Sequence, residues 1–187
     1  ERVTMSKKAV NVGVIKLKES EWNQASIIIC GVVCTFFTHI NDNDNEYSSA
    51  CCKYLECKDL VRVEIDDGYE LVFASSADKE LEEDEYGEVV VNESELNMAA
   101  MFILRQNLMK DEYTYDKSVP AVFSDVIVMR KDSDGEYVNV CMDDFVSKVS
   151  DMDGSTVVLE KFVVKKPRRN NSDNTGSMPG LPRFSEN

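Results

Sequence analysis

Residues 26–40 read SIIICGVVCTFFTHI, and between Ile27 and Phe37 only Gly31 and Thr35 interrupt the apolar character. A helix that spans a bilayer needs about 20 apolar residues, so this run is too short to be one. Its β-branched and aromatic residues are the types that suit a strand. A continuous apolar run between polar segments is typical of a strand that is covered on both faces. We therefore predict that this stretch is the central strand of a buried sheet.

The segment before it is also predicted to be a strand. Alternate positions of residues 9–18 carry three valines: Val10, Val12 and Val14. Ile15 and Leu17 then have the opposite parity, and Gly13 lies beside the change. One extra residue in a strand shifts its side chains to the other face, and glycine often marks such a position. The pattern therefore predicts a β-bulge near Gly13.

The clearest local signal is a hairpin at residues 60–73. Residues 60–65 alternate with Val61, Val63 and Ile65 on one face, and residues 69–73 return with Tyr69, Leu71 and Phe73. Asp67-Gly68 between them favours a type I′ turn. Before this hairpin, residues 41–49 are predicted to be a loop, and residues 50–57 fit either a helical turn or a short strand.

The segment that follows is acidic and leads into a helix. Residues 77–88 carry closely spaced carboxylates, which predicts a solvated loop or a frayed turn, and residues 89–91 a short strand. Residues 92–110 are predicted to be the main helix, because Asn92 and Glu95 have the spacing of a capping box. Met98 and Met101 make a second face of this helix apolar, which is explained either by core packing or by an adaptable partner-binding surface.

The remaining pattern completes a fold dominated by strands. Strands are predicted at residues 120–131, 136–142 and 156–164, a turn at 132–135 and two helical turns at 143–149. We expect one globular α+β domain at residues 1–164, in which about seven strands form a small antiparallel barrel or sandwich packed on helix 92–110. Residues 165–187 are a basic, then Asn/Ser/Gly/Pro-rich tail with no regular structure of its own.

No recognised catalytic or cofactor-binding motif is present, so we expect neither an enzyme nor a cofactor. The single histidine, His39, has the opposite strand parity to Cys34, which makes a poor nucleophilic pair. Cys30 and Cys34 would be about 13 Å apart along a strand, too far to share a zinc ion. Cys52 and Cys57 could ligate from a loop, but no second pair has zinc-like spacing. We expect mostly reduced thiols, with no metal site.

The charge is unevenly distributed. The chain carries −14 in total, but residues 165–187 hold five basic residues against two acidic ones, or +3, so residues 1–164 carry −17. An acidic body repels a phosphate backbone. With no secretory pattern at residues 1–11, we expect an intracellular location or a place within an assembled particle, and no association with membrane.

These observations favour a non-catalytic assembly subunit of a larger complex, such as a viral or phage particle. A tail of this composition is seldom ordered alone, so another subunit is expected to hold it. The predicted partner-binding residues are Lys165, Lys166, Arg168, Arg169 and Phe184 in the tail, with Met98 and Met101. The alternative is an OB-like protein that binds single-stranded nucleic acid. In it, bases would stack on four aromatic residues: Phe36, Phe37, Tyr69 and Phe73.

Overall fold

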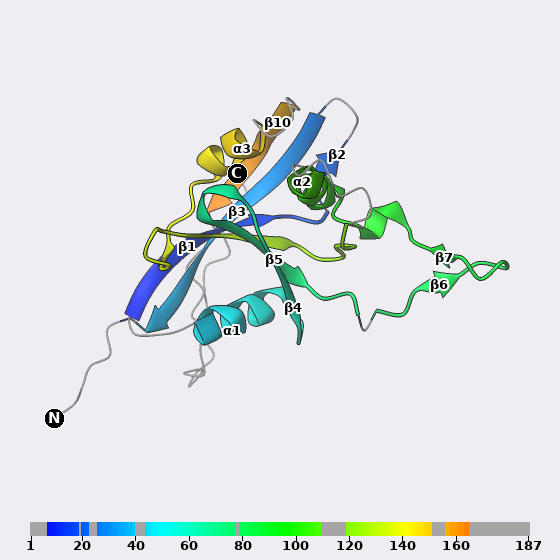
Figure 1. The fold of residues 1–187 in the computed structure, drawn as a ribbon, viewed down its shortest axis with the longest axis horizontal. Coiled ribbons are helices and arrows are strands. Elements are labelled where there is room, and N and C mark those ends of the chain that lie inside the picture. The colour runs from blue at the N-terminus through cyan, green and yellow to red at the C-terminus, as the bar shows by residue number, and fades with distance from the viewer. Residues whose placement is uncertain are drawn as a thin grey trace, which may run out of the picture.

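The computed structural model describes residues 7–18, 20–22, 26–39, 44–77, 79–109, 119–150 and 156–164. Its centre is an eight-stranded sheet (Figure 1), whose main path runs β10-β3-β1-β8-β5-β4. The strands are β1 (Lys7–Ile15), β2 (Glu21–Trp22), β3 (Ser26–His39), β4 (Leu60–Glu64), β5 (Tyr69–Ala74), β8 (Val126–Lys131), β9 (Tyr137–Val138) and β10 (Thr156–Val164). β10 pairs with β3 in parallel and the other pairs are antiparallel; β2 adds to β3 and β9 to β8.

The predicted β-dominated α+β class is confirmed, whereas the predicted barrel or sandwich is wrong. The sheet stays open, with β10 and β4 at the two ends of its path. In the described ranges the second sheet is a two-stranded hairpin, β6 (Glu82–Glu83) with β7 (Val89–Val90), which does not pack as a sandwich layer. Helices cover the sheet on both faces instead, so its apolar strands need no second sheet to bury them.

β3 confirms the prediction for residues 26–39 and is flanked by β1 on one side and β10 on the other. Ile27 and Ile29 belong to one buried cluster, whereas Val32, Cys34 and Phe36 belong to a second. Because successive side chains of a strand point to opposite faces, this division shows that β3 is buried on both faces. Burial on both faces explains why the apolar run of β3 is nearly continuous.

The predicted bulge near Gly13 is wrong. β1 pairs with β3 without a shift from Lys7 opposite His39 to Ile15 opposite Gly31. Ile15 has the opposite parity to the valines because it faces the other apolar cluster. Gly13 has a packing role: a Cβ atom at this position would lie 2.1 Å from Sδ of Met142.

Two helices cover one face of the sheet and one covers the other (Figure 1). α2 (Met98–Met109) and α3 (Met142–Ser150) pack in the cluster of Ile27, and α1 (Asp44–Leu55) packs in the cluster of Phe36. The prediction of a loop at residues 41–49 is wrong from Asp44 onward. Tyr47, Ala50 and Cys51 are buried at helical spacing. Of the two structures predicted for residues 50–57, a helical turn or a short strand, the helix is the one observed, up to Leu55.

The predicted helix at 92–110 is divided into two pieces. Asn92 caps a short 3-10 turn, η2 (Glu93–Glu95), by accepting a hydrogen bond from the Ser94 amide. The α-helix itself begins at Met98, and its cap is Asn97, whose side chain accepts from the Ala100 amide at 3.2 Å. The capping-box spacing at Asn92 therefore marks the 3-10 turn, and the α-helix begins only at Met98.

Both predicted hairpins are present, but the strands predicted at residues 120–131 and 136–142 are shorter, because β8 begins at Val126 and β9 ends at Val138. Between β4 and β5, Asp67 and Gly68 have φ values of 59° and 78°, as a type I′ turn requires, and the Tyr69 amide donates to Asp66 O. Between β8 and β9, the Gly135 amide donates to Asp132 O at 3.0 Å. The helical turns predicted at 143–149 are α3, and the final predicted strand is β10. None of the helices within the described ranges is long and apolar enough to cross a membrane.

Candidate functional site

A narrow hairpin extends away from the sheet between β5 and α2 (Figure 1). We call residues 79–95 the acidic arm; they comprise β6, β7 and η2. Glu82 pairs with Val90 and Glu83 with Val89. The expectation of a solvated loop for residues 77–88 is therefore wrong at β6, whereas the short strand predicted at 89–91 is confirmed at β7.

The tip of the acidic arm is a structured turn centred on Asp84. One oxygen of its carboxylate, Oδ1, accepts from the amides of Tyr86 (2.9 Å) and Glu88 (2.8 Å). Its carbonyl accepts from the Gly87 amide at 3.0 Å, and Gly87 has a φ of 77°. Asp84 and Gly87 have the spacing that a type I turn prefers at its first and fourth positions. That local signal could have predicted the hairpin from sequence.

The acidic arm carries the exposed large apolar side chains of the described residues. They are Leu81 (41% exposed), Tyr86 (82%), Val89 (52%) and Val90 (52%). Apolar residues that are scattered singly over a surface need no explanation, but a gathered group marks a candidate interaction site. Sequence reasoning missed these residues because the surrounding carboxylates dominated the composition of the segment.

The electrostatics of the arm are equally one-sided. Residues 79–95 contain eight carboxylates and one basic residue, Lys79. The ammonium of Lys79 lies 3.7 Å from Glu95 Oε2 and 3.7 Å from the centroid of the Phe123 ring. Lys79 therefore connects the outgoing and returning ends of the arm to the body, while the tip presents acidic and apolar groups to its surroundings.

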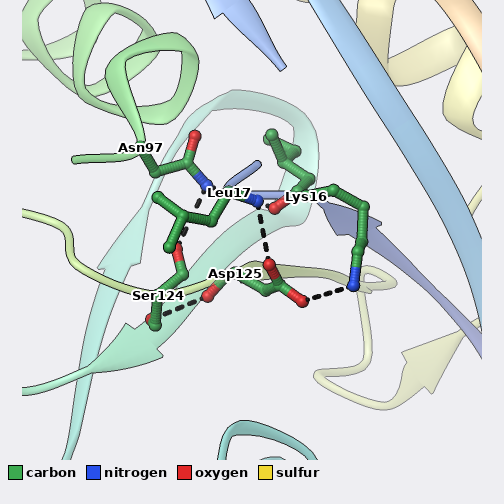
Figure 2. Close-up of polar contacts among 6 residues, drawn as sticks. Lys16, Leu17, Asn97, Ser124 and Asp125 are labelled. Atoms are coloured by element: carbon green, nitrogen blue, oxygen red, sulfur yellow. Dashed lines mark hydrogen bonds and ion pairs between the residues drawn. The ribbon is translucent and has the colours of Figure 1, made fainter. Parts of the chain in front are cut away.

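Where the arm rejoins the body, Asn97 fixes it to two other segments (Figure 2). Its side-chain amide donates to Ile15 O at 3.2 Å and to Ser124 O at 3.1 Å, and its backbone amide donates to Val122 O at 2.8 Å. Asn97 is 1% exposed. These bonds satisfy buried carbonyls of β1 and of the segment before β8.

Asp125 strengthens the same junction (Figure 2). Its carboxylate accepts from the Leu17 amide at 2.8 Å and pairs with the ammonium of Lys16 at 2.9 Å. Ser124 Oγ accepts from the Ala74 amide at 3.1 Å, which adds β5 to the group. The arm therefore leaves and re-enters the body at a hydrogen-bonded junction of β1, β5 and α2.

The two methionines predicted to bind a partner lie together on α2. Met98 and Met101 are half-buried and line a cavity of about 300 Å³ with Phe102, Arg105 and Val119. Met101 and Phe102 also contact the buried cluster of Ile27. The packing of Met101 and Phe102 agrees with the first explanation, core packing, whereas the adaptable partner-binding surface stays a prediction.

Three of the four aromatic residues of the nucleic-acid alternative lie in the buried core and not in a groove. Phe36, Tyr69 and Phe73 are each 1% exposed and belong to the core, so their rings offer no face to a base. Phe37 lies in β3, but its side chain is outside the described part of the structure. The tail residues Lys165, Lys166, Arg168, Arg169 and Phe184 are also outside the described residues.

A polar cluster lies on the β5 side of α3. Tyr69 Oη donates to Asp144, and Arg130 lies 3.8 Å from the same carboxylate. Burial, followed by this hydrogen bond, raises the pKa of Tyr69 above its ordinary value. Lys148 pairs with Asp67 at 2.5 Å, and this contact lowers the pKa of Asp67 and raises that of Lys148. These contacts hold α3 against the β4–β5 hairpin, and this structural role accounts for the shifted pKa values.

A second cluster lies beneath α1. Glu70 is 4% exposed, and its Oε1 lies 3.5 Å from Nη1 of Arg62. Tyr137 Oη donates to Glu70 Oε2 at 3.4 Å. Within the described ranges, no three His, Cys, Asp or Glu side chains are grouped in a way that could hold a metal ion. The titratable groups of these two clusters thus form hydrogen bonds and ion pairs within the fold. The acidic arm is therefore the strongest candidate site for binding.

No protein-family model, curated protein or solved structure matches this chain.

Proposed function

We propose that this chain is a non-catalytic assembly subunit and that the acidic arm is the element through which it docks to another protein subunit. The observation that carries the proposal is the position of Leu81, Tyr86, Val89 and Val90. These side chains are exposed on one hairpin that extends from the body.

Burial of these side chains against a partner would be favourable. Removal of apolar surface from water contributes about 25 cal/mol per Å², and an aromatic anchor such as Tyr86 is enriched at the energetic centres of interfaces. The turn around Asp84 fixes the hairpin before any contact is made. A preformed element loses less conformational freedom on binding than a flexible loop does.

The charge of the arm specifies the partner surface. Eight carboxylates surround the apolar side chains, so the complementary surface is basic and contains apolar pockets. The segment at residues 165–169 supplies the positive charge, with Lys165, Lys166, Arg168 and Arg169 close together, and Phe184 in the same tail adds an apolar group. We therefore propose a second copy of this chain as the partner, with its basic tail on the arm.

The apolar face of α2 provides a second contact in this proposal. α2 begins three residues after the arm ends, and Met98 and Met101 line its cavity. Thioether side chains adapt to partners of different shape. In this proposal the tail of the second copy crosses the arm and continues along the apolar face of α2. Its Phe184 would then occupy the cavity lined by Met98 and Met101.

The mass of the full chain, measured by light scattering on a sizing column, tests the proposal. We expect an oligomer that dissociates when Tyr86→Ser, Val89→Thr and Val90→Thr are combined, with unchanged circular dichroism. A truncated chain that ends at Val164 should also be monomeric. The matched control replaces charged residues at a different exposed turn, Asp134→Asn with Glu136→Gln, and should remain oligomeric.

Two results would count against the proposal. A full chain that is monomeric at every concentration contradicts docking between copies, and an oligomer that survives the arm substitutions contradicts the role of the arm. Binding of a labelled single-stranded oligonucleotide by the monomer, weakened by salt, would favour the nucleic-acid alternative.

A further inference from the structure

The C-terminus of α1 is closed by two cysteines. Glu56, the residue after the helix, has a φ of 54°, which is the left-handed conformation. The Cys57 amide then donates to Cys52 O at 3.1 Å. A left-handed residue followed by a hydrogen bond that spans six residues is the Schellman arrangement of a helix end.

A contact between the side chains of the two residues joined by this bond frequently accompanies the arrangement. In most helices the contact is between apolar side chains, but here both residues are cysteines. The bond from the Cys57 amide to Cys52 O holds the two residues side by side at the end of α1, and Cys52 Sγ lies 3.6 Å from Lys58 O. Both side chains are half-buried, so small reagents can reach them.

We propose that Cys52 and Cys57 form a reversible disulfide site that reacts with low-molecular-weight disulfides. In the first step the Cys52 thiolate attacks one sulfur of the small disulfide and expels a thiolate, leaving a mixed disulfide on Cys52. Cys57 then loses its proton and attacks Sγ of Cys52, which expels the second small thiolate. The protein loses two electrons and two protons, and the small disulfide becomes two thiols.

The other cysteines differ from this pair in position. Cys51 points into the core, with its Sγ 3.9 Å from Sδ of Met129, and burial raises its pKa to about 12. Cys30 and Cys34 are buried in β3. Cys141 is exposed but precedes α3, which covers the opposite face of the sheet from α1. Cys141 therefore serves as an internal example of an accessible thiol that lies away from the pair.

The pH dependence of ring closure follows from the position of Cys57. Burial, followed by the neighbouring Cys52 thiol, raises the pKa of Cys57 to about 11. Once Cys52 carries the mixed disulfide, its thiol no longer acts on Cys57, but burial, the larger cause, still raises the pKa of Cys57 above its ordinary value. Its thiolate is therefore scarce near neutral pH, and the second step should accelerate as the pH rises, by up to about tenfold per pH unit while the thiol is mostly protonated. The mixed disulfide should be trapped when a reaction at pH 7 is quenched with acid, and it should disappear faster at pH 9.

The test uses the full chain treated with glutathione disulfide, followed by alkylation of the remaining thiols and mass spectrometry. A closed pair makes the protein about 2 Da lighter and leaves two fewer thiols to alkylate. Trypsin cleaves after Lys53, between the two cysteines, so the disulfide should join peptide 19–53 to peptide 54–58. A protein of monomeric mass on a non-reducing gel shows that the bond is within one chain, whether or not copies associate.

Three variants assign the bond. Cys51→Ser should retain the link between the peptides, because its neighbour Cys52 makes it. Cys52→Ser and Cys57→Ser should lose the link and accumulate a mixed disulfide on the remaining thiol. The proposal is overturned if Cys52 and Cys57 stay separately alkylated while Cys141 is modified, or if Cys51→Ser abolishes the link in a protein with native circular dichroism.

Discussion

Asn97 donates a hydrogen bond from its side-chain amide to the carbonyl oxygen of Ile15 at 3.2 Å. This bond joins the residue that caps α2 to the last residue of β1, and the same amide also donates to Ser124 O. One buried side chain thus caps the helix and satisfies two carbonyls on other segments. The acidic arm returns to the body at this residue, so its orientation depends on the same contacts.

Replacement of Asn97 by alanine should lower the free energy of unfolding by about 2–4 kcal/mol. The helix loses its cap, and the buried carbonyl of Ile15 and the half-buried carbonyl of Ser124 lose a donor. Urea denaturation followed by circular dichroism measures the change. Asn92→Ala is the matched control, because its bond to the Ser94 amide is exposed, and it should cost less than about 1 kcal/mol. Equal losses in the two variants would contradict the role assigned to Asn97.

Gly13→Ala tests the packing of β1 against α3. The new methyl group would meet Sδ of Met142, a side chain that is 1% exposed. Excess volume in a packed core costs about 1–3 kcal/mol, so we expect a loss of that size in urea denaturation. Met142→Ala removes the obstructing atoms, and Gly13→Ala should then cost little on that background. Additive costs in the double-mutant cycle would show that the two residues do not conflict.

Local patterns predicted much of the sheet from sequence. The β4–β5 hairpin was predictable because alternation at Val61 and Val63 and the Asp67-Gly68 turn agree over a short segment. β3 was predictable because its apolar run reflects burial on both faces. Its pairing with β10, which is distant in sequence, leaves no local pattern, so local patterns do not distinguish this open sheet from a barrel or sandwich.

The errors in the candidate site have the same kind of cause. Asn92 matched the local rule for a helix cap, but tertiary hydrogen bonds made Asn97 the cap of α2. The carboxylates around Tyr86 suggested a solvated loop, although Asp84 and Gly87 carried a turn signal. The cavity at Met98 and Met101 is lined partly by Val119, which lies outside α2. The periodicity of the helix therefore could not predict this cavity.

The ion pair of Arg62 with Glu70 predicts an asymmetric response to mutation. Arg62→Met would leave the buried Glu70 carboxylate without its cation, and loss of one partner of a buried pair costs about 3–5 kcal/mol. Since Arg62 is 27% exposed, we expect a value at the lower end of this range. Adding Glu70→Gln should recover part of the loss in the same denaturation assay. A double variant that is less stable than Arg62→Met alone would contradict the explanation.

The last prediction concerns Tyr69 and alkaline pH. Burial, followed by the hydrogen bond to Asp144, raises the pKa of Tyr69 in the folded state above the ordinary value of 10.0. The folded protein therefore holds this proton more tightly than the unfolded chain does. The resulting stabilisation is fully present below pH 10 and is lost as the pH rises above it.

Tyr69→Phe should reduce the decline in unfolding free energy above pH 10, at a cost of about 1 kcal/mol near pH 7 for the lost hydrogen bond. The difference between the phenolate absorbance titrations of the wild type and Tyr69→Phe gives the pKa directly. Asp144→Asn should lower that pKa while leaving it raised, because burial is the larger cause. A difference titration centred at the ordinary value would show that the phenol is not held in the folded state as the structure describes.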